Sequence, residues 1–344
     1  MNKTTTLRPV IRRIEQPDPD EIGNSPEAFL RWLGGPTALF IKGENPGRCR
    51  AVCTLLHGNE PSGTVAIFNY LKSCKTPRVD TLFIIASVKT AMTPPVFSHR
   101  MLPGVRDLNR CFKPPYEDVP GQLAKSILEL IHAVQPECLI DIHNTSGSGP
   151  AFGVAISEDP YHIAITSMFT NDLIVTDLRL GALMELSERD VVTVTVECGG
   201  AQDHSANLVA QEGLHRYLST EYLEPARERQ YPVNIFRNPI RLETRVPGPV
   251  AYSDSAEESA VITLPAQAEK FNYGTLTHDE RIATLGPAGL AALSAKDHQG
   301  NERLQEFFVA RDNQLYARHP IKVFMVTTNP AIAESDCLFY FIAC

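Results

Sequence analysis

The sequence predicts an α/β protein with a mostly parallel mixed sheet flanked by helices, followed by a smaller β-rich domain. Three observations support this class. Short aliphatic runs show little period-two alternation, which is typical of strands that are buried on both faces. Helical patterns separate these runs, and alternating strands and helices indicate an α/β domain. After about Tyr222 the chain changes to closely spaced β-like runs.

Four aliphatic runs are the expected central strands. They are "RAVCTLL" (50–56), "TLFIIAS" (81–87), "ECLIDI" (137–142) and "VVTVTV" (191–196). Two helical patterns lie between them, because apolar residues recur three or four positions apart. The residues concerned are Val65, Phe68 and Leu71 in the first pattern, and Leu123, Ile127, Leu130 and Val134 in the second.

The chain divides into two predicted domains. We expect residues 1–225 to form a catalytic α/β domain and residues 226–344 to form the β-rich C-terminal domain. The charged, proline-bearing stretch "EPARERQYPVNIFRNP" separates the region of alternating strands and helices from the region of short β-like runs. Beyond it, the runs "AVITL", "RIATL", "EFFVA", "IKVFMV" and "CLFYFI" favour short strands.

Composition and charge exclude several classes of protein. The chain has 40 acidic and 32 basic residues, a net charge of -8 and no long basic run, which argues against nucleic acid as the main partner. Its apolar runs are too short for a membrane span, and its first residues lack the apolar segment of a signal peptide. We therefore expect a cytoplasmic protein. None of the eight cysteines forms a CxxC pair, so buried reduced thiols are expected instead of disulfides or a cysteine-based zinc site.

Polar residues gather where the aliphatic runs end. In an open α/β sheet, ligands bind at the carboxyl ends of the strands, so these positions are the ones to inspect for a functional site. The polar residues found there are His57, Glu60, Asp141, His143, Asn144 and Glu197.

Three of these residues predict a metal site. Two histidines and one carboxylate are the protein ligands of catalytic zinc in carboxypeptidase-type enzymes, and His57, Glu60 and His143 form such a set. We expect one zinc ion per chain. The pattern differs from the helical HExxH arrangement, because a second strand supplies the third ligand. A single histidine at a strand end would more often make an ordinary hydrogen bond, so the prediction depends on the joint placement.

Glu197 is the predicted catalytic residue. Hydrolysis of an amide needs a group that takes a proton from water and passes it to the departing nitrogen. Glu197 directly follows "VVTVTV", where packing alone explains a carboxylate poorly, since a lone buried charge is costly. The alternative is an exposed loop acid.

For the other candidate site residues, two interpretations remain open. Asn109 and Arg110, in "RDLNR", either tie a loop down or anchor a substrate carboxylate, for which the arginine fork is well suited. Asp141 lies two residues before His143 on the same strand face, so it either orients that histidine or is a structural acid.

Taken together and in order, "HGNE", "DLNR", "DIHNTSG" and "VECGG" resemble the succinylglutamate desuccinylase/aspartoacylase family, relatives of the zinc carboxypeptidases. The resemblance covers most of residues 53–222, and "FNYGTLTHDERIATLG" resembles the family's C-terminal β domain. It implies zinc on His57, Glu60 and His143, with Glu197 as the proton-transferring carboxylate.

The resemblance also implies a substrate class. Asn109 and Arg110 would hold the carboxylate of an N-acyl amino acid, and Asp107 would shape their loop. Family members that recognise aspartate carry further arginines and a late tyrosine. Arg100, Arg106 and Arg189 are out of register with those arginines, so whether they reach the pocket stays open.

These inferences predict a zinc-dependent amidohydrolase that removes the acyl group from a small N-acyl amino acid or related amine. The alternatives are a zinc carboxypeptidase acting on short peptides and a non-catalytic zinc-binding protein of the same fold. We expect a small-molecule substrate and neither a nucleic-acid nor a membrane partner. A homo-oligomer is compatible with the sequence.

Overall fold

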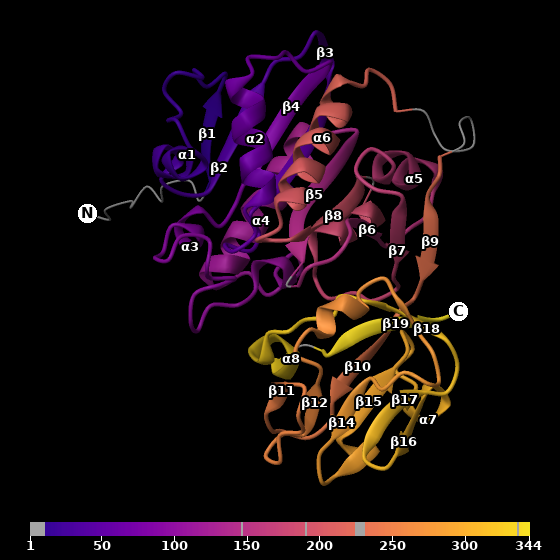
Figure 1. Cartoon of the computed structure of the whole chain (residues 1–344). Coiled ribbons are helices and arrows are strands. Elements are labelled where there is room, and N and C mark those ends of the chain that lie inside the picture. Colours follow the sequence, from indigo (N-terminus) through magenta and orange to yellow (C-terminus); the bar gives the residue numbers. More distant parts are fainter. Residues whose placement is uncertain (1–10, 146, 190, 224–230, 336) are drawn as a thin grey trace.

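The computed structural model describes residues 11–145, 147–189, 191–223, 231–335 and 337–344. Figure 1 shows two parts: a large sheet with helices packed on its faces and, below it, a smaller part built mainly of strands. The predicted α/β class is confirmed.

Nine strands form the large sheet, in the order β1-β2-β4-β3-β5-β8-β6-β7-β9. Their bounds are Arg12–Glu15 (β1), Thr37–Ile41 (β2), Asn45–Thr54 (β3), Val79–Ile85 (β4), Cys138–Thr145 (β5), Phe152–Ala155 (β6), Asp172–Val175 (β7), Val192–Gly200 (β8) and Asn234–Arg237 (β9). The sheet is mixed: β2 with β4 and β6 with β8 are antiparallel, and the other neighbouring pairs are parallel. The four predicted central strands are confirmed as β3, β4, β5 and β8, side by side in the middle of the sheet.

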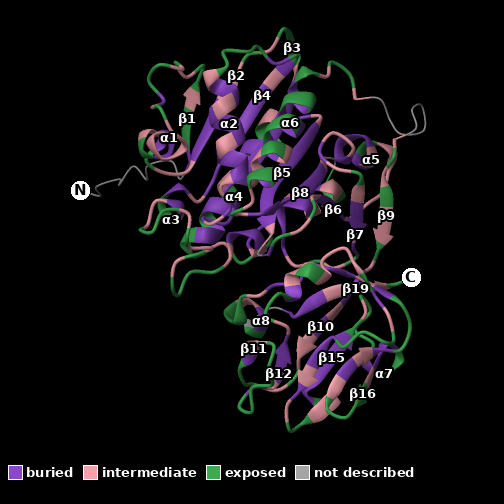
Figure 2. Ribbon diagram, viewed as in Figure 1, coloured by how far each residue is buried: buried purple, intermediate pink, exposed green. Residues whose placement is uncertain are grey.

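Helices cover both faces of the large sheet, which is why its central strands are buried (Figure 2). Alternate residues of β3 divide between two apolar clusters: Val52 packs with one set of helices, and Ala51 and Cys53 pack with α4 on the other face. The helices are α1 (Pro26–Leu33), α2 (Ser62–Lys72), α3 (Val88–Ala91), α4 (Val119–Val134), α5 (Pro160–Thr166) and α6 (His204–Ser219). Both predicted helices are confirmed, as α2 and α4. The first N–H groups of α4 find an acceptor in Asp118, whose side chain bonds the Gly121 N–H at 2.9 Å.

The smaller part contains two five-stranded sheets with a shared apolar core. One sheet has the order β13-β18-β19-β10-β15, with bounds Thr275–Leu276, Ile321–Phe324, Phe339–Ala343, Ile240–Thr244 and Leu293–Lys296. The other has the order β11-β12-β14-β17-β16, with bounds Val250–Tyr252, Ile262–Leu264, Ala283–Leu285, Gln314–Ala317 and Phe308–Arg311. Two short helices accompany them, α7 (Leu304–Phe307) and α8 (Pro330–Ser335). Each of the five β-like runs of the sequence overlaps one of these strands.

The chain passes from the large sheet to the smaller part between β9, which ends at Arg237, and β10, which begins at Ile240. The predicted domain boundary, at residues 225 and 226, lies outside the described residues. β9 follows it in sequence but pairs with β7 in the large sheet. The strands of the smaller part begin at Ile240.

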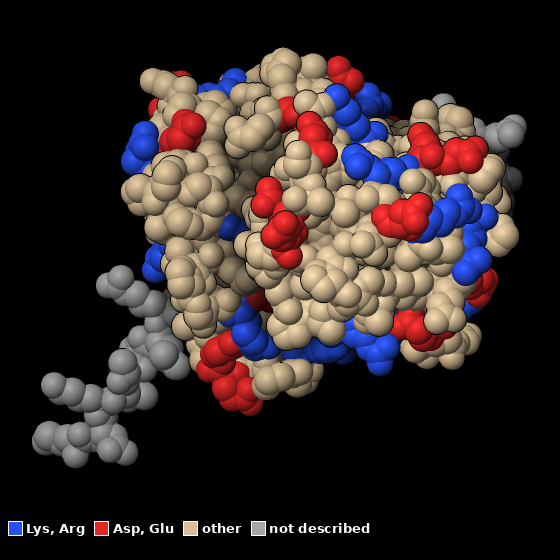
Figure 3. Space-filling view, turned by 60° about the horizontal axis from the view of Figure 1, so that its bottom comes forward, with Lys and Arg blue, Asp and Glu red and all other residues tan. Residues whose placement is uncertain are grey.

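The carboxyl ends of β5 and β8 point toward the smaller part (Figure 1). An aromatic cluster joins the two parts there: the Tyr273 ring lies 5.5 Å from that of Phe152 and 5.0 Å from that of Phe324. Figure 3 brings this end of the molecule forward and shows a deep hollow with acidic and basic atoms in its walls. The smaller part therefore packs beside the strand ends that carry the polar residues.

The cysteine prediction needs a correction. All eight cysteines are free, but only Cys53, Cys111, Cys138, Cys198 and Cys337 are buried. Cys49 is half-buried, because it lies in the partly exposed first half of β3. Cys74 and Cys344 are exposed, because they lie just after α2 and at the last residue. Among the described residues no helix is both long and apolar enough to cross a membrane.

Candidate metal centre

A strained turn after β3 brings His57 to the end of the sheet. Leu55 has a φ of 58°, in the left-handed region that leucine rarely adopts. Ser87 holds this conformation: its N–H donates to the Leu55 carbonyl at 2.8 Å, and its hydroxyl donates to the Leu56 carbonyl at 3.0 Å. The turn is fixed from the end of β4, so His57 is placed by two neighbouring strands.

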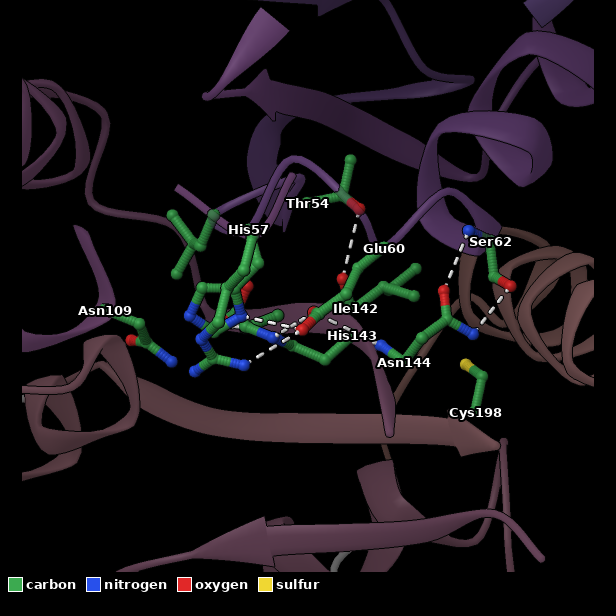
Figure 4. Close-up of polar contacts among 12 residues, drawn as sticks. Thr54, His57, Glu60, Ser62, Asn109, Ile142, His143, Asn144 and Cys198 are labelled. Carbon is green, nitrogen blue, oxygen red and sulfur yellow. Dashed lines mark hydrogen bonds and ion pairs between the residues drawn. The ribbon is translucent and has the colours of Figure 1, made fainter. Parts of the chain in front are cut away.

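Helix α2 starts unusually close to β3. A Cβ atom on Gly63 would lie 2.0 Å from Thr54 Oγ1, so only glycine fits there. The Thr54 hydroxyl donates to the Ile142 carbonyl at 3.0 Å, which ties β3 to β5 (Figure 4). This close packing places the turn that carries Glu60 directly beside the end of β5.

His57, Glu60 and His143 meet at these strand ends, as the sequence predicts. His57 Nδ1 lies 2.8 Å from Glu60 Oε1, and His143 Nδ1 lies 2.7 Å from Glu60 Oε2. All three residues are buried, and each offers one ligand atom within 4.8 Å of the other two. In Figure 4 the two rings and the carboxylate point toward one another.

Each imidazole also contacts a further carboxylate through its Nε2 atom, on the side away from Glu60. Asp107 Oδ1 lies 2.9 Å from His57 Nε2, and Asp141 Oδ2 lies 2.7 Å from His143 Nε2. Metal-binding histidines commonly donate their other N–H to a carboxylate in this way, which fixes the tautomer and the ring orientation. Here the Nε2 contacts leave both Nδ1 atoms turned toward Glu60. Of the two interpretations of Asp141, this contact favours the one in which it orients His143.

The charges of this cluster favour a cation. Burial alone would raise the pKa of Glu60, but His57 and His143 outweigh it and lower that pKa. Burial also opposes the charged form of Asp107, and contacts with His57 and Arg100 lower its pKa. Burial disfavours charged His143, yet Asp141 and Glu60 raise its pKa well above the usual value. Three carboxylates surround two imidazoles and the guanidinium of Arg100, so the site stabilises positive charge.

Glu197 lies in β8, directly across from His143 in the β5–β8 register. Its Oε2 atom is buried and has no hydrogen-bond partner among the described residues. Burial raises the pKa of Glu197 to about 7, although nearby His143 acts in the opposite direction. A carboxyl group with such a pKa can both accept and donate a proton near neutral pH. The alternative of an exposed loop acid does not describe this position.

Asn109 and Arg110 lie in the short 3-10 helix Leu108–Arg110. The Asn109 N–H donates to Asp107 Oδ1 at 2.8 Å, and Asn109 Oδ1 accepts the Leu183 N–H at 2.9 Å. Asn109 therefore ties this loop to a neighbouring segment. Arg110 donates to the Asn109 carbonyl at 2.9 Å and forms no ion pair with a carboxylate in the part of the chain that the structure describes, although it is near enough to Asp107 to help lower the pKa of that carboxyl group. Its guanidinium is available to an anion.

Arg100 reaches the site, whereas Arg106 and Arg189 do not join it. Arg100 Nη2 lies 2.9 Å from Asp107 Oδ2, and Nη1 lies 3.5 Å from Glu60 Oε1. Arg106 pairs with Asp118 at 2.6 Å, and Arg189 is exposed. Sequence reasoning left Arg100 undecided. Arg100 lies in the loop "HRMLPGVRDLNR" (99–110), whose irregular backbone gives no sequence pattern from which the direction of a side chain can be predicted.

Solved structures share this fold over most of their length. Succinylglutamate desuccinylase/aspartoacylase from Rhodobacter sphaeroides is 14% identical, with 89% of this chain and 88% of that chain covered and a TM-score of 0.57. Succinylglutamate desuccinylase from Vibrio cholerae is 13% identical, with 93% and 95% covered and a TM-score of 0.57. The one from Vibrio parahaemolyticus is 15% identical, with 89% and 85% covered and a TM-score of 0.55.

The resemblance inferred from four short motifs is therefore confirmed at the level of the fold. At sequence identities this low, the similarity to these structures supports only a shared fold. No protein-family model and no curated protein matches the sequence.

Proposed function

We propose that this protein is a zinc-dependent hydrolase that cleaves the amide bond of an N-acyl amino acid or a related small N-acyl amine. One observation carries the proposal. The Nδ1 atoms of His57 and His143 converge with Glu60, each histidine is backed by its own carboxylate, and Glu197 lies across from His143. A structural histidine cluster needs neither the surplus of buried carboxylates nor an acid without a partner.

The residues present fit a zinc ion. Two imidazole nitrogens and one carboxylate oxygen are the donor set of a catalytic zinc site with an open position. Asp107 and Asp141 would orient the two histidine ligands. When bound, zinc supplies Lewis acidity, which polarises a carbonyl group and lowers the pKa of water.

Glu197 would move the proton. Water adds to the acyl carbon, the carbon–nitrogen bond breaks, and the proton that leaves the water goes to the departing nitrogen, so the products are a carboxylate and an amine. The partner-free Oε2 atom of Glu197 and the raised pKa of this residue support that role.

Two arginines would act on the substrate. Arg110 forms no ion pair with a carboxylate among the described residues, and a guanidinium fork suits the carboxylate of an N-acyl amino acid. Arg100 is held between Asp107 and Glu60, close to the proposed ligands. From there it would stabilise the negative charge that develops on the acyl oxygen.

The proposal includes the domain organisation. Residues 1–225 would form a catalytic domain of the zinc-carboxypeptidase type, and residues 226–344 a β-rich C-terminal domain, except that β9 of the latter range joins the sheet of the catalytic domain. The separate apolar core of the two five-stranded sheets supports this division.

Two alternatives use the same residues. A zinc carboxypeptidase would need the same metal site, but the structures that share this fold carry the names of desuccinylases and aspartoacylases, which favours a deacylase. A non-catalytic zinc protein would leave the buried Oε2 atom of Glu197 unexplained.

A substrate panel tests the proposal. The protein would be incubated with zinc and either N-acyl amino acids, including N-succinylglutamate and N-acetylaspartate, or short peptides, and release of free amine would be measured. We expect cleavage of at least one N-acyl amino acid, loss of activity with a chelator and recovery with zinc. Peptide cleavage alone would establish the carboxypeptidase, and a zinc-loaded protein that cleaves neither class would contradict both.

A further inference from the structure

We propose that Asn144 is a positioning residue that sets the end of β8, and with it Glu197, relative to the metal centre. The inference rests on the proposed function, since it assigns a role in that reaction to a residue outside the ligand set and the proton-transfer group.

The first observation is a bulge beside the site. In the β5–β8 ladder His143 pairs with Glu197, but Thr145 pairs with Gly200, so two residues of β8 face Asn144 alone. A bulge of this kind leaves a backbone group outside the ladder and redirects the neighbouring side chains. Gly199 lies in the bulge, and its φ of 108° is in the left-handed region.

Asn144 closes this gap with its side chain. Its Nδ2 atom donates to the Gly199 carbonyl at 3.0 Å and to Ser62 Oγ at 2.9 Å, and its Oδ1 atom accepts the Ser62 N–H at 3.1 Å. Asn144 is only 3% exposed, so these bonds are shielded from water. An amide that offers one acceptor and two donors meets all three partners, which neither a carboxylate nor a hydroxyl can do.

The same residue also touches the proposed ligand set. The Asn144 N–H donates to Glu60 Oε2 at 3.3 Å, and His143 is its neighbour in the chain. Asn144 therefore links Glu60 with the bulge that follows Glu197: its backbone N–H contacts Glu60, and its side chain contacts Gly199. Figure 4 shows Asn144 on the far side of His143, directed toward Ser62.

The functional consequence follows from geometry. A displacement of about 1 Å at a reacting group can cost about 100-fold in rate. Loss of an outer partner of a metal site typically costs about 10- to 100-fold in metal affinity or activity. Without the Asn144 amide, the Gly199 carbonyl would lose its hydrogen bond to the Asn144 side chain, and the end of β8 that follows Glu197 would be less firmly set relative to Glu60.

Three variants of the full-length protein test this. Asn144→Ala removes the whole side chain. Asn144→Asp keeps the shape and the acceptor for the Ser62 N–H, but places a carboxylate oxygen against the Gly199 carbonyl. Ser62→Ala is the control: it removes the hydrogen bonds of the Ser62 hydroxyl with Asn144 and Asn207 and leaves the Asn144–Gly199 bond intact. Co²⁺ affinity by visible absorption, kcat, KM and thermal stability would be measured for each.

We expect Asn144→Ala and Asn144→Asp to weaken Co²⁺ binding about 10- to 100-fold and to lower kcat by at least as much, with KM nearly unchanged. Ser62→Ala should change each value by less than about threefold. Native Co²⁺ affinity and kcat in either folded Asn144 variant would overturn the inference. So would a Ser62→Ala variant impaired as much as Asn144→Ala, because the bond to Gly199 would then not be the one that matters.

The metal readout separates this inference from the proposed function. If the wild-type protein binds Co²⁺ but cleaves no N-acyl amino acid, the deacylase proposal fails, and the affinities of the variants still decide the role of Asn144 at the metal. If the wild-type protein binds no Co²⁺, the metal centre and this inference both fall.

Discussion

Two buried histidine clusters in this protein look alike at first but differ in charge. His162 is only 1% exposed, and its Nδ1 and Nε2 atoms lie 2.7 Å from Asp159 and 2.9 Å from Ser187. His143 is equally buried and also has a carboxylate on one side, but its other nitrogen faces a second carboxylate, that of Glu60.

The pKa values of the two histidines separate the clusters. Burial lowers the pKa of His162, and one half-exposed aspartate does not reverse this. The pKa of His143 is raised well above its usual value, because two buried carboxylates outweigh the effect of burial. Asp159 also caps α5, and Ser187 bonds the Thr193 backbone, so the His162 cluster holds three segments together. A buried histidine alone is thus weak evidence for a metal, whereas surplus buried carboxylates around it are strong evidence.

The largest expected effect concerns Glu197, which has no counterpart at His162. Glu197→Gln keeps the shape of the side chain and removes its basic oxygen. Proton transfer by a positioned group is worth about 10²- to 10⁴-fold, so kcat should fall by that factor. Zinc content and thermal stability should stay close to native. Retained turnover at full zinc would mean that another group moves the proton, and loss of zinc would make Glu197 a ligand or structural residue.

The second-largest expected effect tests whether Arg110 anchors the substrate carboxylate. Arg110→Ala removes a guanidinium that would bond the substrate carboxylate, an interaction between charged groups worth about 1.5–3 kcal/mol. KM should therefore rise roughly 10- to 100-fold, with kcat and zinc content little changed. Steady-state kinetics on the acid and on its uncharged amide analogue would check this. Equal processing of acid and amide by the native enzyme would contradict the anchoring role.

The carboxylates behind the histidines provide a third test. Asp107→Asn and Asp141→Asn keep the shape but weaken the contacts to His57 and His143. Zinc affinity should fall about 10- to 100-fold in each variant, as competition with a chromophoric chelator would show. Asp159→Asn, the equivalent change behind His162, should leave zinc affinity at the native value. A matching loss in that variant would show that the two clusters do not differ as described.

The smallest effect concerns His162 and depends on pH. His162→Gln should lower the free energy of unfolding by about 1–3 kcal/mol at pH 7.5, because buried partners lose a hydrogen bond. The pKa of His162 is lower in the folded state than in the unfolded state, so its contribution is fully present above pH 6.5 and is lost as pH falls below it. Urea unfolding of both proteins should show a smaller difference at pH 5.5 than at pH 7.5. A constant or growing difference would contradict the assignment.

Sequence reasoning found the central strands because they are aliphatic on both faces. It missed edge strands such as β9, whose residues Asn234–Arg237 carry polar ends and no aliphatic run. The meeting of His57, Glu60 and His143, with Glu197 beside them, could be predicted because each follows a recognisable aliphatic run, and the ends of such runs share one edge of a sheet. The contacts of Arg100 and Asn144 could not be predicted, since they depend on an irregular loop and on a bulge in the β5–β8 register.

Metal analysis tests the central claim most directly. After saturation with zinc and removal of excess, the zinc content per chain would be measured for the wild-type protein, His57→Ala, His143→Ala and His162→Ala, with folding checked by circular dichroism. If only the His57–Glu60–His143 cluster binds metal, we expect about one zinc ion per chain in the wild-type protein and in His162→Ala, and a severe loss of zinc in the other two variants. Normal zinc content in folded His57→Ala or His143→Ala would contradict the metal centre described above.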